Sequence, residues 1–323
     1  MILNKKNFLF ILILIFIIFY SLFYYINFLQ TSTIVKKNTY YFLKQNTSQR
    51  SIVEDLSIKN IKISFIEWKL ISFLNLRNFI PKAGEYLIPK NSTIFDIQKL
   101  LNDGKTITRK FTLIEGTTAL HLKQNLLDNK YMSGKIDDLA EGVYKPDTYN
   151  FKYGFPRKKM LQRMKIAQEN ILDNIWRKKT KSFILKNKNE LLTLASIIQK
   201  EAKSLNDSRL IASVFINRLE KKMKLQSDVT LAYGFKVNGN KITKKMLKSN
   251  HPYNTYYHFG LPPTPISYPG EDALRSLENI LKTDYLFFVS DGNGEHRFSK
   301  TYKSHKKNIK LWKNKILKES DVK

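Results

Sequence analysis

The chain has no cysteine among its 323 residues. Disulfide bonds, thiolate nucleophiles and cysteine-ligated metals are therefore excluded. The five histidines show no HExxH or comparable ligand spacing, and the GxSxG, GxGxxG and P-loop patterns are missing as well. The sequence thus gives no support for a metal centre, a serine-nucleophile elbow or a phosphate-cradling loop, and we expect an activity without a cofactor.

Acidic residues are scarce: 27 of them face 56 lysines and arginines, which gives a formal net charge of +29. A charge of this size is typical of nucleic-acid-binding or polybasic membrane-surface proteins. The lysines are spread along the whole chain, however, and no nucleic-acid-binding signature accompanies them. We therefore expect no nucleic-acid partner, although a basic surface is attracted to anionic lipid headgroups or to an acidic polymer.

One long hydrophobic run occupies residues 8–29 and contains no charged residue. Its length matches the roughly 20 residues that a helix needs to cross a hydrocarbon core. Lys5 and Lys6 precede the run, and the positive-inside tendency places them in the cytoplasm and the rest of the chain across the membrane. Lys36 and Lys37, which follow the run, argue weakly for the opposite orientation.

A cleaved signal peptide is the alternative to a membrane anchor. The apolar run is long for a signal peptide, and Thr31 to Thr33 make a poor small-residue cleavage site. We therefore favour an uncleaved, single-pass anchor.

Short β-rich runs alternate with helical ones between residues 30 and 108. A strand, a polar turn and a short helix occur twice, around 40–56 and 84–101, which indicates a weak internal repeat. Ser92 precedes the second helix, at 93–101, as an expected N-cap. The region is predicted to be a small binding or spacer module.

The remainder of the chain mixes both kinds of element. Predicted strands and helices lie at 109–113 (strand), 117–127 (helix), 158–180 (a long basic helix), 191–202 (helix), 207–219 (helix), 273–281 (helix), 285–290 (buried strand) and 297–299 (returning strand), with a small hairpin around Asn238-Gly239. Four prolines crowd the end of 251–270, which predicts an extended loop. Long loops without secondary structure in a compact domain are usually functional.

Glu201 stands out among the acidic residues because it shares the apolar stripe of its helix. Leu191, Leu194, Ile197 and Ile198 recur at steps of three and four, and Glu201 continues the series. A carboxyl beside apolar neighbours loses hydration of its charged form, which raises its pKa and suits it to act as a general acid. The alternative is a glutamate at the rim of the helix that reaches out to water.

Five stretches of the chain resemble successive motifs of the YceG-like endolytic murein transglycosylases. They are PDTYNF (146–151), LASIIQKEA (194–202), VFINRLEKKMKLQSDVTLAYG (214–234), PYNTYYHFGLPPTPISYPG (252–270) and DYLFFVSDGNGEHRFSKTYKSH (284–305). The stretches occur in the order of the family. The region before them is similar to the small LysM-like module of these proteins.

The resemblance implies an α+β fold and a single-pass inner-membrane protein with a periplasmic catalytic domain. It divides the chain into a cytoplasmic N-terminus, a transmembrane helix, a LysM-like module, a mixed α/β catalytic domain and a tail, at 1–7, 8–29, 30–108, 109–315 and 316–323. The implied partners are peptidoglycan glycan strands, the cell membrane and cell-wall synthases.

The implied reaction breaks the bond between N-acetylmuramic acid and N-acetylglucosamine in nascent glycan strands. It leaves a 1,6-anhydro end and would terminate glycan elongation. Glu201 matches the catalytic glutamate of the family. Gln199 replaces a second glutamate that many members carry, and Val229 replaces a proline. One carboxyl suffices because the C6 hydroxyl of the substrate can replace the second carboxylate that ordinary glycosidases need.

Polar and aromatic side chains near Glu201 in the sequence are candidates to bind sugar hydroxyls and acetamido groups: Gln226, Ser227, Asp228, Tyr253, Asn254, Thr255 and Tyr256. For each of them, hydrogen bonds that merely pack the loops are an equal alternative. Glu141 is an alternative catalytic carboxylate, and His296 and His305 are expected to stabilise the C-terminal hairpin. The competing function is a membrane-anchored glycan-binding scaffold without turnover.

Overall fold

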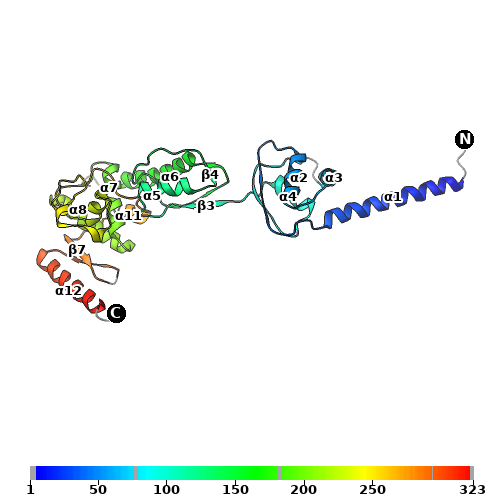
Figure 1. Cartoon of the computed structure of the whole chain (residues 1–323). Helices are drawn as coiled ribbons and strands as arrows, with labels where there is room; N and C mark the ends of the chain where they lie inside the picture. Colours follow the sequence, from blue (N-terminus) through cyan, green and yellow to red (C-terminus); the bar gives the residue numbers. More distant parts are fainter. Residues whose placement is uncertain (1–4, 76–78, 180–183, 279, 293, 321–323) are drawn as a thin grey trace. The chain divides into compact units, whose positions relative to one another are not determined.

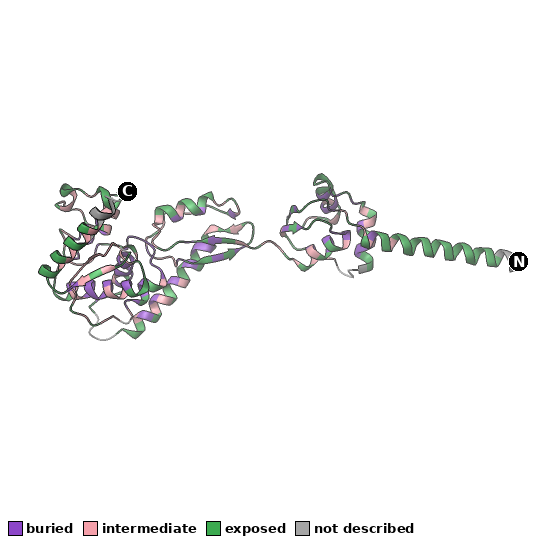
Figure 2. Ribbon diagram, turned by 90° about the horizontal axis from the view of Figure 1, so that it is seen from below, coloured by how far each residue is buried: buried purple, intermediate pink, exposed green. Residues whose placement is uncertain are grey.

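The computed structural model describes residues 5–75, 79–179, 184–278, 280–292 and 294–320. The chain forms two compact units (Figure 1). The N-terminal unit comprises residues 1–109 and 150–154, and the C-terminal unit comprises 110–149 and 155–323. Buried residues gather inside each unit, as Figure 2 shows in purple.

The first helix, α1 (Lys5–Thr31), is the apolar run. Its segment Phe8–Thr31 has a mean hydropathy of 2.7 and is exposed along almost its whole length (Figure 2). The helix is long and apolar enough to cross a membrane, as the sequence predicts, and it also has the character of a signal sequence.

The N-terminal unit contains the predicted pair of strand–helix motifs. Strands β1 (Thr39–Leu43) and β2 (Gly84–Ile88) pair antiparallel, with Tyr41 opposite Tyr86. The helices α2 (Gln49–Ile58), α3 (Phe65–Asn75) and α4 (Ile94–Asp103) contribute side chains to the same core.

Helix α4 begins one residue later than the sequence predicts. Its N-cap is Thr93, whose hydroxyl accepts from the Asp96 N–H at 3.2 Å, while the Asp96 carboxylate accepts from the Thr93 N–H at 2.9 Å. This reciprocal capping box satisfies two backbone donors, so it outcompetes Ser92, whose hydroxyl donates to the Pro89 carbonyl instead. Gly104 ends the helix at φ +70°, in the left-handed region.

Two small two-stranded sheets lie between residues 109 and 156. Strand β3 (Arg109–Thr112) pairs with β5 (Thr148–Phe151), and β4 (Met132–Ser133) runs parallel to β6 (Phe155–Pro156). The remaining elements of the C-terminal unit are α5 (Ala119–Asp128), α6 (Arg157–Lys178), α7 (Lys188–Glu201), α8 (Leu205–Glu220), α9 (Asp228–Gly234), a 3-10 turn η1 (Gly239–Lys241), α10 (Lys244–Leu247), α11 (Glu271–Arg275), β7 (Phe287–Ser290), β8 (His296–Ser299) and α12 (Tyr302–Ser320).

Helix α7 forms the centre of the C-terminal unit. Asn187 caps its N-terminus, with the side-chain oxygen accepting from the Glu190 N–H at 2.9 Å. Every residue from Leu191 to Ile198 is buried, in a core that α8 and α11 share. The helix ends at Glu201 because Ala202 adopts an extended conformation. The buried helix α7 therefore holds Glu201 in a fixed position at its C-terminal end.

Three of the predicted elements are wrong in detail. The Asn238-Gly239 pair starts the 3-10 turn η1 rather than a hairpin, since no strand flanks it. The helix expected at 273–281 is the shorter α11, and the strand expected from residue 285 begins at Phe287 with partly exposed side chains. Residues 251–270 contain neither helix nor strand, as predicted.

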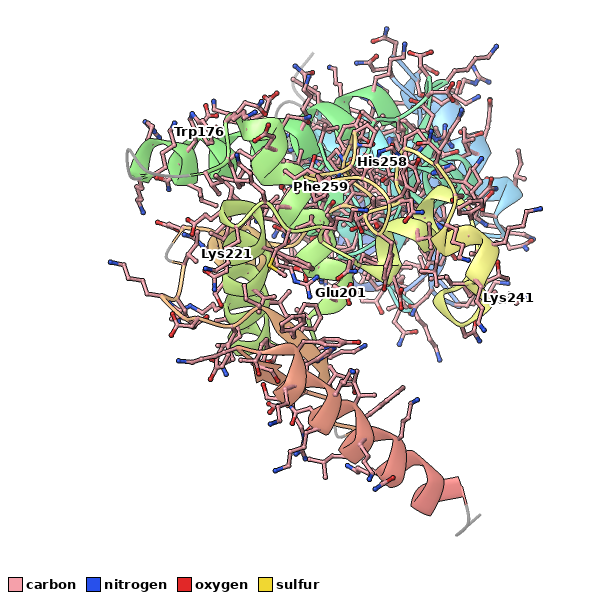
Figure 3. All side chains as sticks on the ribbon, turned by 90° about the vertical axis from the view of Figure 1, so that its left-hand side faces the viewer. Trp176, Glu201, Lys221, Lys241, His258 and Phe259 are labelled. Atoms are coloured by element: carbon pink, nitrogen blue, oxygen red, sulfur yellow. The ribbon has the colours of Figure 1, made fainter. Side chains whose placement is uncertain are left out.

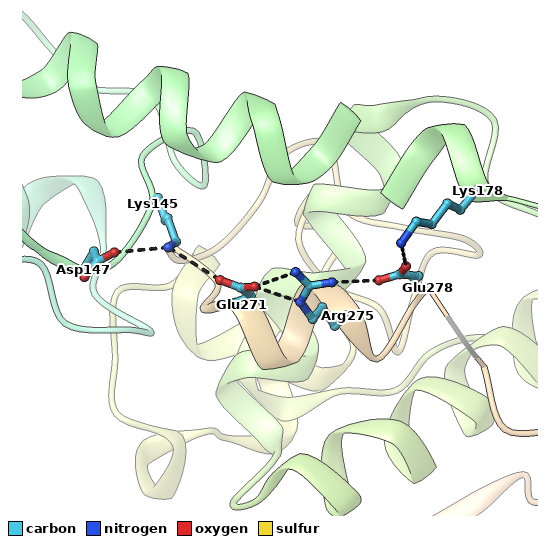
Figure 4. A network of polar contacts seen from close by, with 6 residues as sticks. All are labelled: Lys145, Asp147, Lys178, Glu271, Arg275 and Glu278. Carbon is cyan, nitrogen blue, oxygen red and sulfur yellow. Dashed lines mark hydrogen bonds and ion pairs between the residues drawn. The ribbon is translucent and has the colours of Figure 1, made fainter. Parts of the chain in front are cut away.

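A chain of ion pairs on the C-terminal unit links α6, α11 and the 145–147 segment (Figure 4). Arg275 lies at its centre and contacts Glu271 at 2.7 Å and Glu278 at 3.1 Å. Lys145 extends the network from Glu271 to Asp147, and Lys178 of α6 contacts Glu278 at 2.6 Å.

Candidate active site

A polar cleft of about 290 Å³ opens beside the end of α7. Figure 3 labels Glu201 where the helical body meets the β7–β8 hairpin. The side chains that line the cleft come from α7, α8, the start of α9 and the loop before it, the 251–270 loop, the hairpin and α12: Glu201, Arg218, Leu225, Gln226, Asp228, Tyr256, Phe287, Phe288, Tyr302 and His305.

The carboxyl of Glu201 is the acidic group best suited to proton transfer in this cleft. Burial raises its pKa, and the negative charges of Asp228 and Asp207 raise it further. A hydrogen bond from the Ser227 hydroxyl to Glu201 Oε1, at 2.6 Å, and the charge of His296 oppose that rise. The net direction is upward, so the protonated form persists to a higher pH than in an ordinary glutamate.

Ser227 is fixed by a buried network of hydroxyl groups. Its N–H donates to Thr255 Oγ1 at 3.0 Å, and the Thr230 hydroxyl donates to its carbonyl at 2.8 Å. The two threonine hydroxyls lie 2.9 Å apart. Ser227, Thr230 and Thr255 are each at most 2% exposed, so the network holds the Ser227 hydroxyl toward Glu201 with little freedom.

Asp228 and Tyr256 form a second polar pair in the cleft. The Tyr256 hydroxyl donates to Asp228 Oδ1 at 2.6 Å. Burial and this hydrogen bond raise the pKa of Tyr256, so its hydroxyl stays protonated. The Asp228 side chain remains accessible on the surface of the cleft.

Gln226 lies in the left-handed region at φ +49°. A non-glycine residue is rarely found there, and such strain is common at functional sites. Its N–H donates to the Thr255 carbonyl at 3.1 Å, and its exposed amide turns toward the cleft. The loop before α9 and the first residue of that helix therefore present Gln226 and Asp228 outward on either side of the buried Ser227.

Arg218 is a cleft residue that sequence reasoning missed. This buried side chain of α8 donates to the carbonyls of Leu286 at 2.6 Å and Leu225 at 2.9 Å, and its guanidinium lies 5.2 Å from the centre of the Phe287 ring. Arg218 thus joins the hairpin to the loop that carries Gln226.

The hairpin and α12 supply the aromatic side of the cleft. Phe287, Phe288 and Tyr302 line it, and the His305 ring stacks on Phe287 at 5.2 Å. Burial and the charge of Arg218 lower the pKa of His305, which favours the neutral ring. Within the described residues, His305 Nδ1 is buried without a hydrogen-bond partner.

His296 of β8 contacts the start of α8. Its Nδ1 is 2.9 Å from Asp207 Oδ2, and its ring meets Phe288 edge-on at 5.3 Å. Asp207 also accepts from the Lys203 N–H at 3.0 Å. The contact with Asp207 joins β8 to the N-terminus of α8.

Four of the candidate sugar-binding residues do not line this cleft: Ser227, which bonds Glu201 from a buried position, and Tyr253, Asn254 and Thr255. The Asn254 amide donates to three carbonyls within the protein, those of Met246, Leu247 and Ser249, and Asn254 is fully buried. Thr255 belongs to the hydroxyl network, and the Tyr253 ring packs on Tyr233 at 5.1 Å. For Asn254 and Thr255 the contacts match the loop-packing alternative.

Glu141, the alternative carboxylate, contacts other elements. It accepts from the Ala119 N–H at 3.0 Å, at the start of α5, and from the Tyr233 hydroxyl at 3.1 Å. Burial raises its pKa, while both hydrogen bonds lower it. Gln199 is also occupied, because its Oε1 accepts from the Gly270 N–H at 2.8 Å. Among the described residues, no group of three His, Asp or Glu side chains is arranged to hold a metal ion.

The chain belongs to the YceG-like family, whose model matches residues 41–311. It is 38% identical over 182 residues to the endolytic murein transglycosylase of Bacillus subtilis (strain 168), covering 55% of this chain and 49% of that protein. It is 34% identical over 176 residues to the endolytic murein transglycosylase of Streptococcus pneumoniae serotype 2 (strain D39 / NCTC 7466), covering 52% of this chain and 31% of that protein. The chain thus spans half or less of the length of these relatives.

A putative yceG-like protein from Listeria monocytogenes, solved by crystallography at 2.6 Å, has a similar fold. The TM-score is 0.53 at 27% identity, and the match covers 84% of this chain and 99% of that one. The predicted mixed α+β fold with a long apolar N-terminal helix is therefore confirmed.

Proposed function

We propose that the chain is an endolytic peptidoglycan lytic transglycosylase that cuts the bond between N-acetylmuramic acid and N-acetylglucosamine in nascent glycan strands. The observation that carries the proposal is Glu201, a carboxyl of raised pKa that the rigid end of α7 and the Ser227 hydroxyl hold beside a polar cleft. The names of the two bacterial relatives support the same reaction class.

The mechanism needs only this one carboxyl. Glu201 gives its proton to the glycosidic oxygen as the bond from that oxygen to C1 of the muramic acid residue breaks. The C6 hydroxyl of the same sugar attacks C1, and the Glu201 carboxylate takes up the hydroxyl proton. One C–O bond breaks and one forms, the proton returns to Glu201, and no water is consumed. The product ends in 1,6-anhydro-N-acetylmuramic acid.

The exposed polar groups of the cleft are the proposed sugar contacts. Gln226 and Asp228 flank Ser227, and Tyr256 orients the Asp228 carboxylate through the 2.6 Å hydrogen bond. Amide and carboxylate groups bond sugar hydroxyls and acetamido groups, and aromatic rings such as Phe288 and Tyr302 stack on the sugar faces. Ser227 positions Glu201 through its hydroxyl, and Thr255 in turn holds Ser227.

The remaining proposals concern the setting of the reaction. We assign α1 as an uncleaved anchor with a cytoplasmic N-terminus, residues 30–108 as a LysM-like module and 109–315 as a periplasmic catalytic domain of the inner membrane. An enzyme that cuts nascent strands acts where they are made, so cell-wall synthases are the proposed protein partners. Cleavage would end glycan elongation.

Uncross-linked glycan strands, incubated with the full chain in detergent, test the function. Mass spectrometry should find 1,6-anhydro ends with the wild type and none with Glu201→Gln. Reducing ends formed by addition of water would make the protein a hydrolase. Intact strands that still bind the wild type would favour the scaffold without turnover.

A further inference from the structure

Helix α3 of the N-terminal unit is apolar on both of its faces. One face is in the core, where Trp68 and Ile71 are fully buried. The opposite face exposes Ile66 at 78% and Phe73 at 82%, and Leu74 beside them is 45% exposed. A helix on a protein surface normally turns charged residues outward, so this face is suited to an apolar environment other than the core.

The end of α1 is attached to the unit that carries α3. Leu29 is only 5% exposed because it belongs to the core of the N-terminal unit. One turn earlier, the Tyr25 hydroxyl donates to Glu67 Oε1 at 3.0 Å. Glu67 itself lies in the first turn of α3, where its Oε2 accepts from the Ser64 N–H.

These contacts fix the depth of α3 relative to a bilayer that contains α1. About 20 residues of a helix cross the hydrocarbon core, so a span that starts near Phe8 reaches the interface in the last two turns of α1. Tyr24 and Tyr25 occur there, which suits the headgroup region, where tyrosine is enriched. Glu67, bonded to Tyr25, therefore starts α3 at the level of the headgroups.

Basic side chains accompany the apolar face. Lys69, the residue on this face between Ile66 and Phe73, and Arg50 of α2 both lie about 6 Å from the Phe65 ring, at 5.8 and 6.0 Å. Cations beside an apolar helix face are typical of helices that lie in the plane of a membrane, where they meet anionic phosphates.

We propose that α3 is an interfacial helix, which inserts Ile66 and Phe73 between the lipids next to α1 and holds the N-terminal unit against the membrane surface. The occupant of the exposed face is the lipid interface itself. The inference goes beyond the catalytic proposal and rests only on the part of it that makes α1 a membrane anchor.

The absence of cysteine makes the test direct, because each introduced cysteine is the single labelling site. Full-length Ile66→Cys and Phe73→Cys carry an environment-sensitive fluorophore in vesicles of phosphatidylcholine and phosphatidylglycerol, at low protein density. Nitroxide-labelled lipid should quench both labels, and aqueous iodide should leave them bright. Leu120→Cys on α5, which is 73% exposed, is the matched control and should show the reverse.

Quenching of the two α3 labels by iodide, as at Leu120, would overturn the proposal. Shielding from both quenchers would also overturn it, since the face would then be covered by protein, such as a second copy of the chain. A label at Ile13→Cys, in the middle of α1, tests the membrane anchor separately from the interfacial helix. Iodide quenching at Ile13 would refute the anchor. Lipid quenching at Ile13 together with iodide quenching at Phe73 would refute the interfacial helix alone.

Discussion

The two units depart from the usual distribution of residues in opposite ways. The N-terminal unit leaves large apolar side chains in the open on α3, although Trp68 and Ile71 fill its core from the other side of the same helix. The C-terminal unit instead holds the partly buried carboxyl of Glu201 against the buried hydroxyl of Ser227. The exposed apolar face of α3 is suited to contact with lipid, as proposed above. A partly buried carboxyl of raised pKa, by contrast, is typical of a catalytic site.

Removing the proton donor from the C-terminal unit should produce the largest effect. Glu201→Gln is expected to lower the rate of strand cleavage by at least about 1,000-fold, because general acid and base catalysis are lost together. Binding of strands should persist. Glu141→Gln, the matched change at the alternative carboxyl, should keep the rate within about tenfold of wild type. Equal losses of cleavage rate in Glu201→Gln and Glu141→Gln would contradict the assignment of Glu201 as the proton donor.

The two faces of α3 should respond very differently to truncation. Ile71→Ala is expected to cost about 2–5 kcal/mol of the free energy of unfolding, as is usual for a buried isoleucine. Phe73→Ala removes a larger side chain but should cost less than about 1 kcal/mol, because its ring is 82% exposed. Denaturant titration of the full chain in detergent measures both. A cost at Phe73 equal to that at Ile71 would mean that the ring packs within the protein.

The neighbours of Glu201 should shift its pKa in opposite directions. The Ser227 hydrogen bond lowers that pKa and the charge of Asp228 raises it. Activity as a general acid exists below the pKa and is lost as the pH rises through it. The alkaline limb of the pH–rate profile should therefore move to higher pH in Ser227→Ala and to lower pH in Asp228→Asn. Ser227→Ala should also lose about tenfold in rate, the equivalent of one hydrogen bond.

If the alkaline limb moved in the same direction in Ser227→Ala and in Asp228→Asn, the assigned effects of these two neighbours on the pKa of Glu201 would be contradicted. A profile that neither substitution moves would show that a different group titrates. Thr230→Val, which removes the hydroxyl that donates to the Ser227 carbonyl, is a useful intermediate, because it loosens Ser227 without removing its hydroxyl.

The ion-pair network on the C-terminal unit should matter least. Arg275→Ala breaks the centre of the ion-pair network in Figure 4 and should cost less than about 1 kcal/mol, because the Arg275 and Glu271 side chains are 44% and 40% exposed and salt screens the pair. Thermal unfolding at low and high salt measures the effect, which should shrink as salt is added. A salt-independent loss of several kcal/mol would show that Arg275 has a packing role instead.

Sequence periodicity could place Glu201 because its helix is long and its apolar stripe is regular. The strand–helix motifs of the N-terminal unit and the strand at Arg109 follow from equally local patterns. Local turn signals were less reliable: Asn238-Gly239 carries a hairpin dipeptide but has no strands to join. The sequence contains the capping box of Thr93 and Asp96, but the adjacent Ser92 is an equally suitable N-cap by residue type, which explains the error of one residue.

The rest of the site could not be derived from local patterns because distant segments build it. Arg218 reaches the Leu286 carbonyl, and His296 reaches Asp207, across long stretches of chain. Asn254 looked like a sugar ligand by residue type, yet its amide is consumed by three carbonyls of a neighbouring turn. Only the tertiary structure decides whether a polar side chain in a loop faces the cleft or holds the loop together.

The protonation state of the Glu201 carboxyl is the most direct test of its role as a general acid, because burial raises its pKa. Infrared difference spectra between wild type and Glu201→Gln isolate its protonated C=O band as the pH is raised. The account predicts that the band persists above the ordinary glutamate pKa of 4.5. A band that disappears at or below that value would contradict the account.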